Sequence, residues 1–198
     1  LGKINTSSLS EYELQRYRLT EAHLMLKREL RLPIESNLDD MAKYFANCED
    51  EASASEAYYI QGAYLNYIGE NTQAMQYLKK AESYPAASII RGMTYYKMGR
   101  ISESEQLYDI ALENYQKALP YLEEAGLPLY LASVYRELGR NTHDESRNQY
   151  FDKALEAARF MGDTILQMDI RYAQLSANQE NSPELASICQ YMCHTAGQ

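Results

Sequence analysis

The residues best suited to chemistry lie near the end of the chain, where Cys189 and Cys193 stand one helical turn apart and His194 follows. Thiolate and imidazole groups bind zinc, but a zinc site needs about four such ligands in tetrahedral geometry. The sequence shows no second ligand pair, and Cys48 lies far away along the chain. Three cysteines also do not describe a disulfide framework. We therefore interpret Cys189 and Cys193 as small apolar core residues of a terminal helix, and we expect no bound metal.

Candidate catalytic residues are scattered along the sequence. The histidines are His23, His143 and His194, and no serine or cysteine stands in a nucleophile elbow or beside a metal-binding histidine pair. His143 follows Thr142 in a polar stretch with Asp144 and Glu145, which favours a solvated loop over a catalytic centre. The glycines are spaced as helix terminators and form no phosphate-binding cluster. We expect a protein that is not an enzyme and that uses no cofactor.

The composition favours a protein or peptide as the partner. The chain has 198 residues, 45% of them hydrophobic, and a formal net charge of −9. An acidic chain lacks the basic face with which a general nucleic-acid binder displaces counterions from phosphates, and anionic lipid repels it. No window approaches about 18 consecutive apolar residues, so we expect no membrane span in this fragment. The chain begins at Leu1 rather than Met, which indicates a fragment or a processed form.

A pattern of small and large residues recurs three times and predicts the architecture. In each copy a small residue is followed three positions later by a large one, and four positions after that by glycine. The copies are Gly62, Leu65 and Gly69; Gly92, Tyr95 and Gly99; and Ala132, Tyr135 and Gly139. Self-similarity at a spacing of about 30 to 40 residues is typical of stacked helical hairpins. Such arrays usually bind other chains.

Helix signals and breaks place the hairpins along the chain. We expect a divergent first hairpin over residues 10–49, repeat hairpins over 52–84, 86–125 and 127–161, and a weaker terminal hairpin over 164–195. Capping boxes at Ser10 and Ser102 are expected to begin helices. The glycine that ends each copy of the pattern is expected to turn the chain, and Pro120 to kink or interrupt a helix. No stretch alternates as a strand does.

These residues resemble the tetratricopeptide repeat (TPR) family. Its pattern places a small residue and an aromatic residue in the first helix of each hairpin, then alanine, a large apolar residue and alanine in the second. The matching residues are Gly62, Leu65, Ala74, Leu78 and Ala81; Gly92, Tyr95, Tyr108 and Ala111; and Ala132, Tyr135, Phe151 and Ala154. Tyr58 and Ser88 replace the family's tryptophan. The resemblance implies an all-α fold, a right-handed α-solenoid of stacked antiparallel helix hairpins, as a single domain over residues 1–198.

The resemblance also implies a binding groove, because the first helix of each hairpin lines the concave face in this family. The residues expected to face it are Tyr59, Ala63 and Asn66; Ile89, Met93 and Tyr96; and Leu129, Ser133 and Arg136. Each set has i, i+4, i+7 spacing and so forms one helix face. The alternative is that some of these side chains are buried against neighbouring helices, including terminal segments. A carboxylate-gripping groove of the family type is disfavoured, because Tyr59, Ile89 and Leu129 stand at its matched positions.

The resemblance implies a scaffold whose concave groove binds a protein or peptide segment, with no nucleic acid bound through this domain. The alternative is a ligand-sensing N-terminal module of a larger envelope-associated transcriptional or two-component regulator. The composition, with 19 tyrosines and no tryptophan, also resembles that of Bacteroidetes repeat proteins, many of which are envelope-associated. On that likeness we expect a periplasmic or envelope-associated location rather than a cytoplasmic one.

Overall fold

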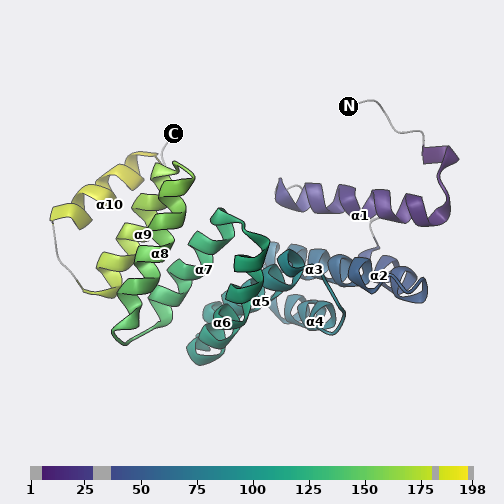
Figure 1. Ribbon diagram of the computed structural model, residues 1–198, viewed down its shortest axis with the longest axis horizontal. Helices are drawn as coiled ribbons and strands as arrows, with labels where there is room; N and C mark the ends of the chain where they lie inside the picture. The colour runs from purple at the N-terminus through teal and green to yellow at the C-terminus, as the bar shows by residue number, and fades with distance from the viewer. Residues whose placement is uncertain (1–5, 29–36, 180–182, 196–198) are drawn as a thin grey trace. The chain divides into compact units, whose positions relative to one another are not determined.

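The computed structural model describes residues 6–28, 37–179 and 183–195, and every regular element within these ranges is helical (Figure 1). The chain divides into two compact units, Leu1–Ile101 and Ser102–Gln198. A single domain over residues 1–198 stays a prediction. The linker at residues 29–36 of the expected first hairpin lies outside the described residues.

The first unit consists of helices that pack as successive neighbours. They are the 3-10 turn η1 (Thr6–Ser8), α1 (Glu11–Lys27), α2 (Leu38–Asn47), α3 (Glu51–Tyr67), α4 (Asn71–Glu82) and most of α5 (Ser88–Ser104). Helix α2 packs against α3 and α3 against α4, whereas α1 lies mainly along α3. The predicted capping box at Ser10 is confirmed, since its side chain accepts from the Glu13 backbone N–H and Glu13 bonds back to Ser10.

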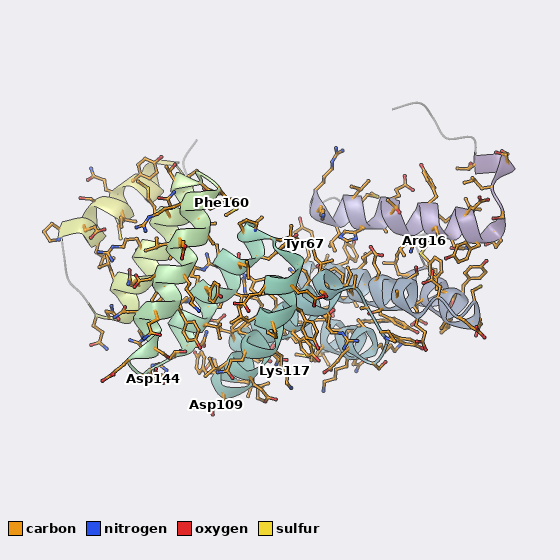
Figure 2. All side chains as sticks on the ribbon, in the orientation of Figure 1. Arg16, Tyr67, Asp109, Lys117, Asp144 and Phe160 are labelled. Carbon is orange, nitrogen blue, oxygen red and sulfur yellow. The ribbon has the colours of Figure 1, made fainter. Side chains whose placement is uncertain are left out.

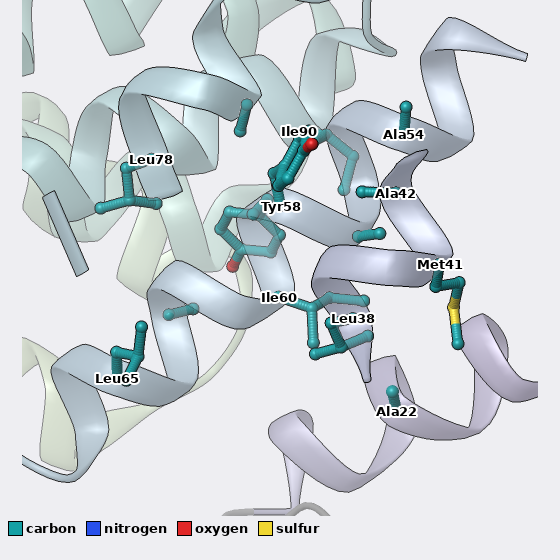
Figure 3. Packing of buried hydrophobic residues seen from close by; sticks show 14 of the residues in the cluster. Ala22, Leu38, Met41, Ala42, Ala54, Tyr58, Ile60, Leu65, Leu78 and Ile90 are labelled. Atoms are coloured by element: carbon teal, nitrogen blue, oxygen red, sulfur yellow. The ribbon is translucent and has the colours of Figure 1, made fainter. Parts of the chain in front are cut away.

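The interior of this unit is built from a row of large side chains set against small ones. Figure 3 shows Leu38 and Met41 of α2 and Ile60 of α3 among the buried residues that fill the space between helices. Burial of each such side chain stabilises the fold by about 1.5–3 kcal/mol. Gly62 lets α4 approach α3, because a Cβ on it would lie 2.8 Å from Cγ of Leu78. The small residue of the repeat pattern is therefore required by close helix packing.

We expect Gly62→Ala to destabilise the protein by about 1–2 kcal/mol. Overpacking costs about 1–3 kcal/mol, and alanine's higher helix propensity returns only about 1 kcal/mol. The new methyl group would also lie 3.1 Å from the backbone oxygen of Ala74, which cannot rotate away. Urea unfolding measures the effect. In the background of Leu78→Ala, which removes the clashing side chain, the same substitution should cost less. Equal costs in the two backgrounds would contradict this packing.

The second unit is also built of helices that pack in succession along the chain. Its helices are α6 (Tyr108–Ala125), α7 (Pro128–Asn141), α8 (Ser146–Phe160), α9 (Thr164–Ala177) and α10 (Pro183–Thr195). Each packs against the next, and α7 also contacts α9. Buried side chains from four of these helices form its core: Tyr115, Leu122, Leu138, Phe151 and Ile170. Phe151 and Ala154 are both buried, as the repeat pattern predicts.

The turns differ in part from the sequence prediction. Gly69 has a φ of 89° and follows α3, as predicted. Gly99 and Gly139 lie inside α5 and α7, so the predicted turns at these glycines are wrong. The chain instead turns after α5 at Gln106, with a φ of 62°. Gly139 serves helix packing, because a Cβ on it would lie 3.0 Å from the ring of Phe151.

Two further positions that were predicted to begin or interrupt a helix lie inside helices. Ser102 is buried within α5 and starts no helix, and the N-cap residue of α6 is Leu107. Pro120 lies inside α6, which continues to Ala125 and ends at Gly126 in the left-handed conformation. Tertiary burial therefore extends helices through positions that read as breaks in the sequence alone.

The fold class is all-α, of the TPR-like solenoid type, with antiparallel helix hairpins packed in succession within each unit. Within the described ranges no strand occurs. Among the same residues, none of the helices is long and apolar enough to cross a bilayer.

Candidate functional site

The predicted groove residues of α3 are largely covered. Tyr59 is only 2% exposed and Ala63 is buried, because α1 lies along this side of α3. The His23 ring of α1 sits 6.4 Å from that of Tyr59, and its Nδ1 lies 2.6 Å from a carboxylate oxygen of Glu56. Asn66, further along, is half-buried. For Tyr59 and Ala63 the structure therefore has the alternative arrangement, burial against a terminal helix, in place of an open groove wall.

The predicted groove residues of α5 are also largely covered, two of them by the core of the first unit. Ile89 and Met93 are partly buried against the hydrophobic core, and Tyr96 is buried. Arg100 lies one turn beyond, with a guanidinium nitrogen 3.4 Å from the Tyr96 hydroxyl oxygen. Little of this row is exposed to a partner.

The predicted row on α7 is the most accessible of the three. Leu129 is exposed, while Ser133 and Arg136 are half-buried. The Ser133 hydroxyl donates to the backbone oxygen of Leu129 at 3.0 Å, so it stays within its own helix. This row belongs to the second unit, and the rows of α3 and α5 belong to the first. A site that includes Leu129, Ser133 and Arg136 is therefore built from residues of the second unit.

A pocket of about 500 Å³ lies beside this row, between the first helices of two successive hairpins. We call it the α7–α9 pocket. It is lined by Arg136, Arg140, Asp169, Tyr172, Ala173, Ser176 and Ala177. Arg140 extends the predicted α7 row by one helical turn. The α9 residues follow i, i+3, i+4, i+7, i+8 spacing and so share one face. Sequence reasoning found Arg136 here, whereas the spacing on α9 was a usable signal that it missed.

The α7 wall of this pocket is held by a buried carboxylate. Glu137 is 1% exposed, and its Oε1 accepts from Nε and Nη2 of Arg136 at 3.1 and 2.6 Å. Arg136 also pairs with Asp169 of α9 through Nη1. Arg140 adds a longer contact to Glu137, at 3.4 Å. Two hydrogen bonds to one Glu137 oxygen, together with the Asp169 pair, restrict the orientation of the guanidinium, so the pocket wall is preorganised.

The α9 wall of the pocket presents both aromatic and polar side chains. Tyr172 is 38% exposed and lies one turn from Asp169, and Ser176 follows one turn later with an exposed side chain. An aromatic ring beside polar groups is typical of surfaces that bind peptides. The arrangement can hold a ligand through desolvation, ring contact and hydrogen bonds.

Cys48 and Cys189 are the cysteines whose side chains the structure describes, and both are exposed free thiols. Ile188 of α10 is buried and Cys189, the next residue, is exposed, because neighbouring positions on a helix face different directions. The interpretation of Cys189 as a core residue is therefore wrong, and the side chains of Cys193 and His194 lie outside the described residues. Within the described part of the chain, no group of three or more His, Cys, Asp or Glu side chains is placed to hold a metal ion.

Comparison with known proteins adds two relatives. The chain is 30% identical over 115 residues to Photosystem I assembly protein Ycf3 of Prochlorococcus marinus strain MIT 9312, covering 54% of this chain and 65% of the relative. It is 31% identical over 106 residues to the same protein of strain MIT 9301, covering 50% and 60%. The match thus spans less than two thirds of each relative's length. No family model matches the chain, and no solved structure matches it significantly.

These relatives bear on the resemblance inferred from the repeat pattern. Both are similar to the present chain over about half of its length. They lend no support to the likeness to Bacteroidetes proteins. The all-helical fold of packed hairpins and the similarity to these two relatives together support a TPR-type family for this chain.

Proposed function

We propose that the chain is a protein-binding scaffold whose α7–α9 pocket holds a segment of a partner protein. The observation that carries the proposal is the pocket itself, a hollow of about 500 Å³ between two neighbouring helices. Its guanidinium, carboxylate, phenol and methyl groups suit a peptide, which offers backbone amides together with polar and apolar side chains. Tyr172 supplies the aromatic surface at which binding energy concentrates.

The names of the two relatives agree with this proposal. Both are called assembly proteins, and assembly calls for a surface that holds protein components. The photosystem in those names belongs to the relatives, and the partner proposed for this chain is defined by the pocket alone. No observation on the described residues favours the regulator alternative.

We propose no catalytic activity and no cofactor for this scaffold. A binding mechanism based on shape and desolvation needs no catalytic group and no cofactor. A chain of net charge −9 is repelled by nucleic acid, so we propose no nucleic-acid partner for this domain. A periplasmic or envelope-associated location remains part of the proposal, on the compositional likeness alone.

We expect Tyr172→Ala to weaken peptide binding about tenfold, since aromatic residues in pockets dominate such interfaces. Peptides would be selected from a random displayed library on the intact chain, and their affinities measured by fluorescence anisotropy. Tyr108→Ala is the matched control, because Tyr108 is an exposed tyrosine of the same unit that does not line the pocket. Selected peptides that bind the Tyr172→Ala protein as tightly as the unaltered one would refute the assignment of the pocket.

A further inference from the structure

A second hollow lies elsewhere in the same unit, along the seam between α7 and α8. Its volume is about 370 Å³. We call it the α7–α8 groove. It is lined by Pro128, Leu131, Tyr135, Lys153, Glu156, Ala157 and Phe160. On α7 these residues follow i, i+3, i+7 spacing, and on α8 they follow i, i+3, i+4, i+7 spacing. The groove is therefore walled by one face of each helix of an antiparallel hairpin.

This groove is separate from the α7–α9 pocket. At 3.6 residues per turn, the row Pro128, Leu131 and Tyr135 lies about 140° around α7 from the row that holds Ser133 and Arg136. The pocket faces α9, whereas the groove faces away from the Arg136 row toward α8. A ligand in one hollow therefore does not occupy the other.

Phe160 sets this groove apart from ordinary surface. It is 83% exposed, although it is one of only three phenylalanines in the chain, and Figure 2 marks it on the last turn of α8. Leu131 and Ala157 continue the apolar lining as half-buried residues. A large aromatic side chain left in water beside an apolar hollow is available to a partner, and its burial would stabilise a complex.

Carboxylates border the groove. The Tyr135 hydroxyl donates to Oε1 of Glu123 at 2.5 Å, and Glu156 is exposed on the opposite wall. Burial and the Glu123 hydrogen bond raise the pKa of Tyr135, so the phenol stays protonated and keeps Glu123 beside the groove at neutral pH. Lys153 is the lining cation, and its Nζ lies 5.2 Å from the centre of the Tyr135 ring. The two lining charges, Lys153 and Glu156, balance, and Glu123 beside Tyr135 adds one negative charge.

We propose that the α7–α8 groove is a second binding site, which accepts an amphipathic helix of a partner protein carrying apolar anchors and flanking lysine or arginine residues. The groove runs along about two helical turns of each wall, or about 10 Å, which matches anchors at i, i+3 or i+4, and i+7 of an incoming helix. Phe160 packs against these anchors. Glu123 and Glu156 pair with the flanking cations, which gives the site its selectivity.

Charge decides between a basic partner and a second copy of this chain. Each copy has a formal net charge of −9, so two copies repel each other over their whole surfaces. A basic helix is attracted both by the chain as a whole and by the carboxylates at the groove border. The proposed occupant is therefore a basic segment of another protein, and it does not depend on the α7–α9 pocket.

The test uses the intact chain and a labelled model peptide of about 14 residues, made of leucine and lysine with leucines on one helix face. Fluorescence anisotropy should show binding that Phe160→Ser weakens about tenfold and Phe160→Leu leaves within about threefold. Glu156→Lys should weaken it by about threefold or more. Circular dichroism checks that each variant stays folded, which the exposure of Phe160 leads us to expect.

Three controls establish whether the peptide binds in this groove and through its apolar face. A peptide of identical composition with scrambled spacing, and one with glutamate in place of lysine, should each bind at least about tenfold more weakly. Tyr172→Ala should leave the affinity unchanged, so failure here is distinct from failure of the α7–α9 pocket. The proposal is overturned if Phe160→Ser binds as the unaltered chain does, or if the scrambled peptide binds equally well. It is also overturned if the chain forms a dimer that Phe160→Ser abolishes, since a second copy would then be the occupant.

Discussion

Replacing Phe151 by alanine is expected to destabilise the protein by about 3–5 kcal/mol. Phe151 is fully buried in α8, and its ring lies against the backbone of α7 where Gly139 leaves room for it. Alanine removes the ring from the core and leaves a cavity that rigid neighbouring helices cannot close. Urea unfolding followed by circular dichroism measures the loss. An effect of this size is a large share of the stability of an ordinary domain.

Phe160→Ala is the matched control for this prediction. Both substitutions delete the same side chain from the same helix, but Phe160 is mostly in water. We expect a change below about 0.5 kcal/mol at position 160, the usual range for an exposed site. Similar losses at the two positions would show that the burial pattern of α8 differs from the one described. The pair also establishes that the Phe160 variants used on the α7–α8 groove report binding and not folding.

Replacing Glu137 by alanine should have the second largest effect, a destabilisation of about 3 kcal/mol. Its carboxylate is buried and holds Arg136 by two hydrogen bonds. Removing it leaves a half-buried guanidinium with less compensation, and that desolvated charge is costly. Glu137→Gln should lose less, because the amide keeps the shape and one acceptor oxygen. Thermal and urea unfolding of both variants would measure the difference.

Glu113→Ala is the control for the Glu137 substitution. Glu113 pairs with Lys117 at 2.7 Å, but both side chains are about half exposed on the surface of α6 (Lys117 is labelled in Figure 2). An exposed pair one turn apart is worth about 0.3–0.5 kcal/mol, and added salt screens it. The same chemical change should therefore cost several times more at position 137 than at position 113. Equal costs would mean that Glu137 is solvated.

The hairpins followed from local signals in the sequence. The first helix of the hairpin expected over residues 52–84 is α3, Glu51–Tyr67, and Gly69 turns the chain after it. These features were predictable because a capping residue, a helix face and a glycine with positive φ act within a few residues. The close approach at Gly62 was predictable for a similar reason, since the small residue recurs at a fixed spacing in each copy of the pattern.

The glycines at positions 99 and 139 carry the same local signal as Gly69, yet helices run through both. The cost of glycine in a helix is only about 1 kcal/mol. Beyond Gly99, burial of Ile101 outweighs it, and beyond Gly139 the buried Asn141 amide keeps a hydrogen bond to the backbone oxygen of Glu137. Burial depends on which helices meet in space, so the sequence in one window does not contain it. The turn at Gln106 in place of Gly99 is the visible result.

The sequence by itself determined the helical class, the positions of most helices and the rows of residues that share a helix face, because these depend on periodicity within each helix. Only the tertiary structure decided which rows are open. Tyr59 and Arg136 belong to equivalent predicted rows, yet Tyr59 is buried by α1 while Arg136 lines a pocket beside α9. Exposure is set by neighbours far away in the chain, so the accessibility of both proposed binding surfaces, and of Phe160 in particular, depends on packing that no local pattern records.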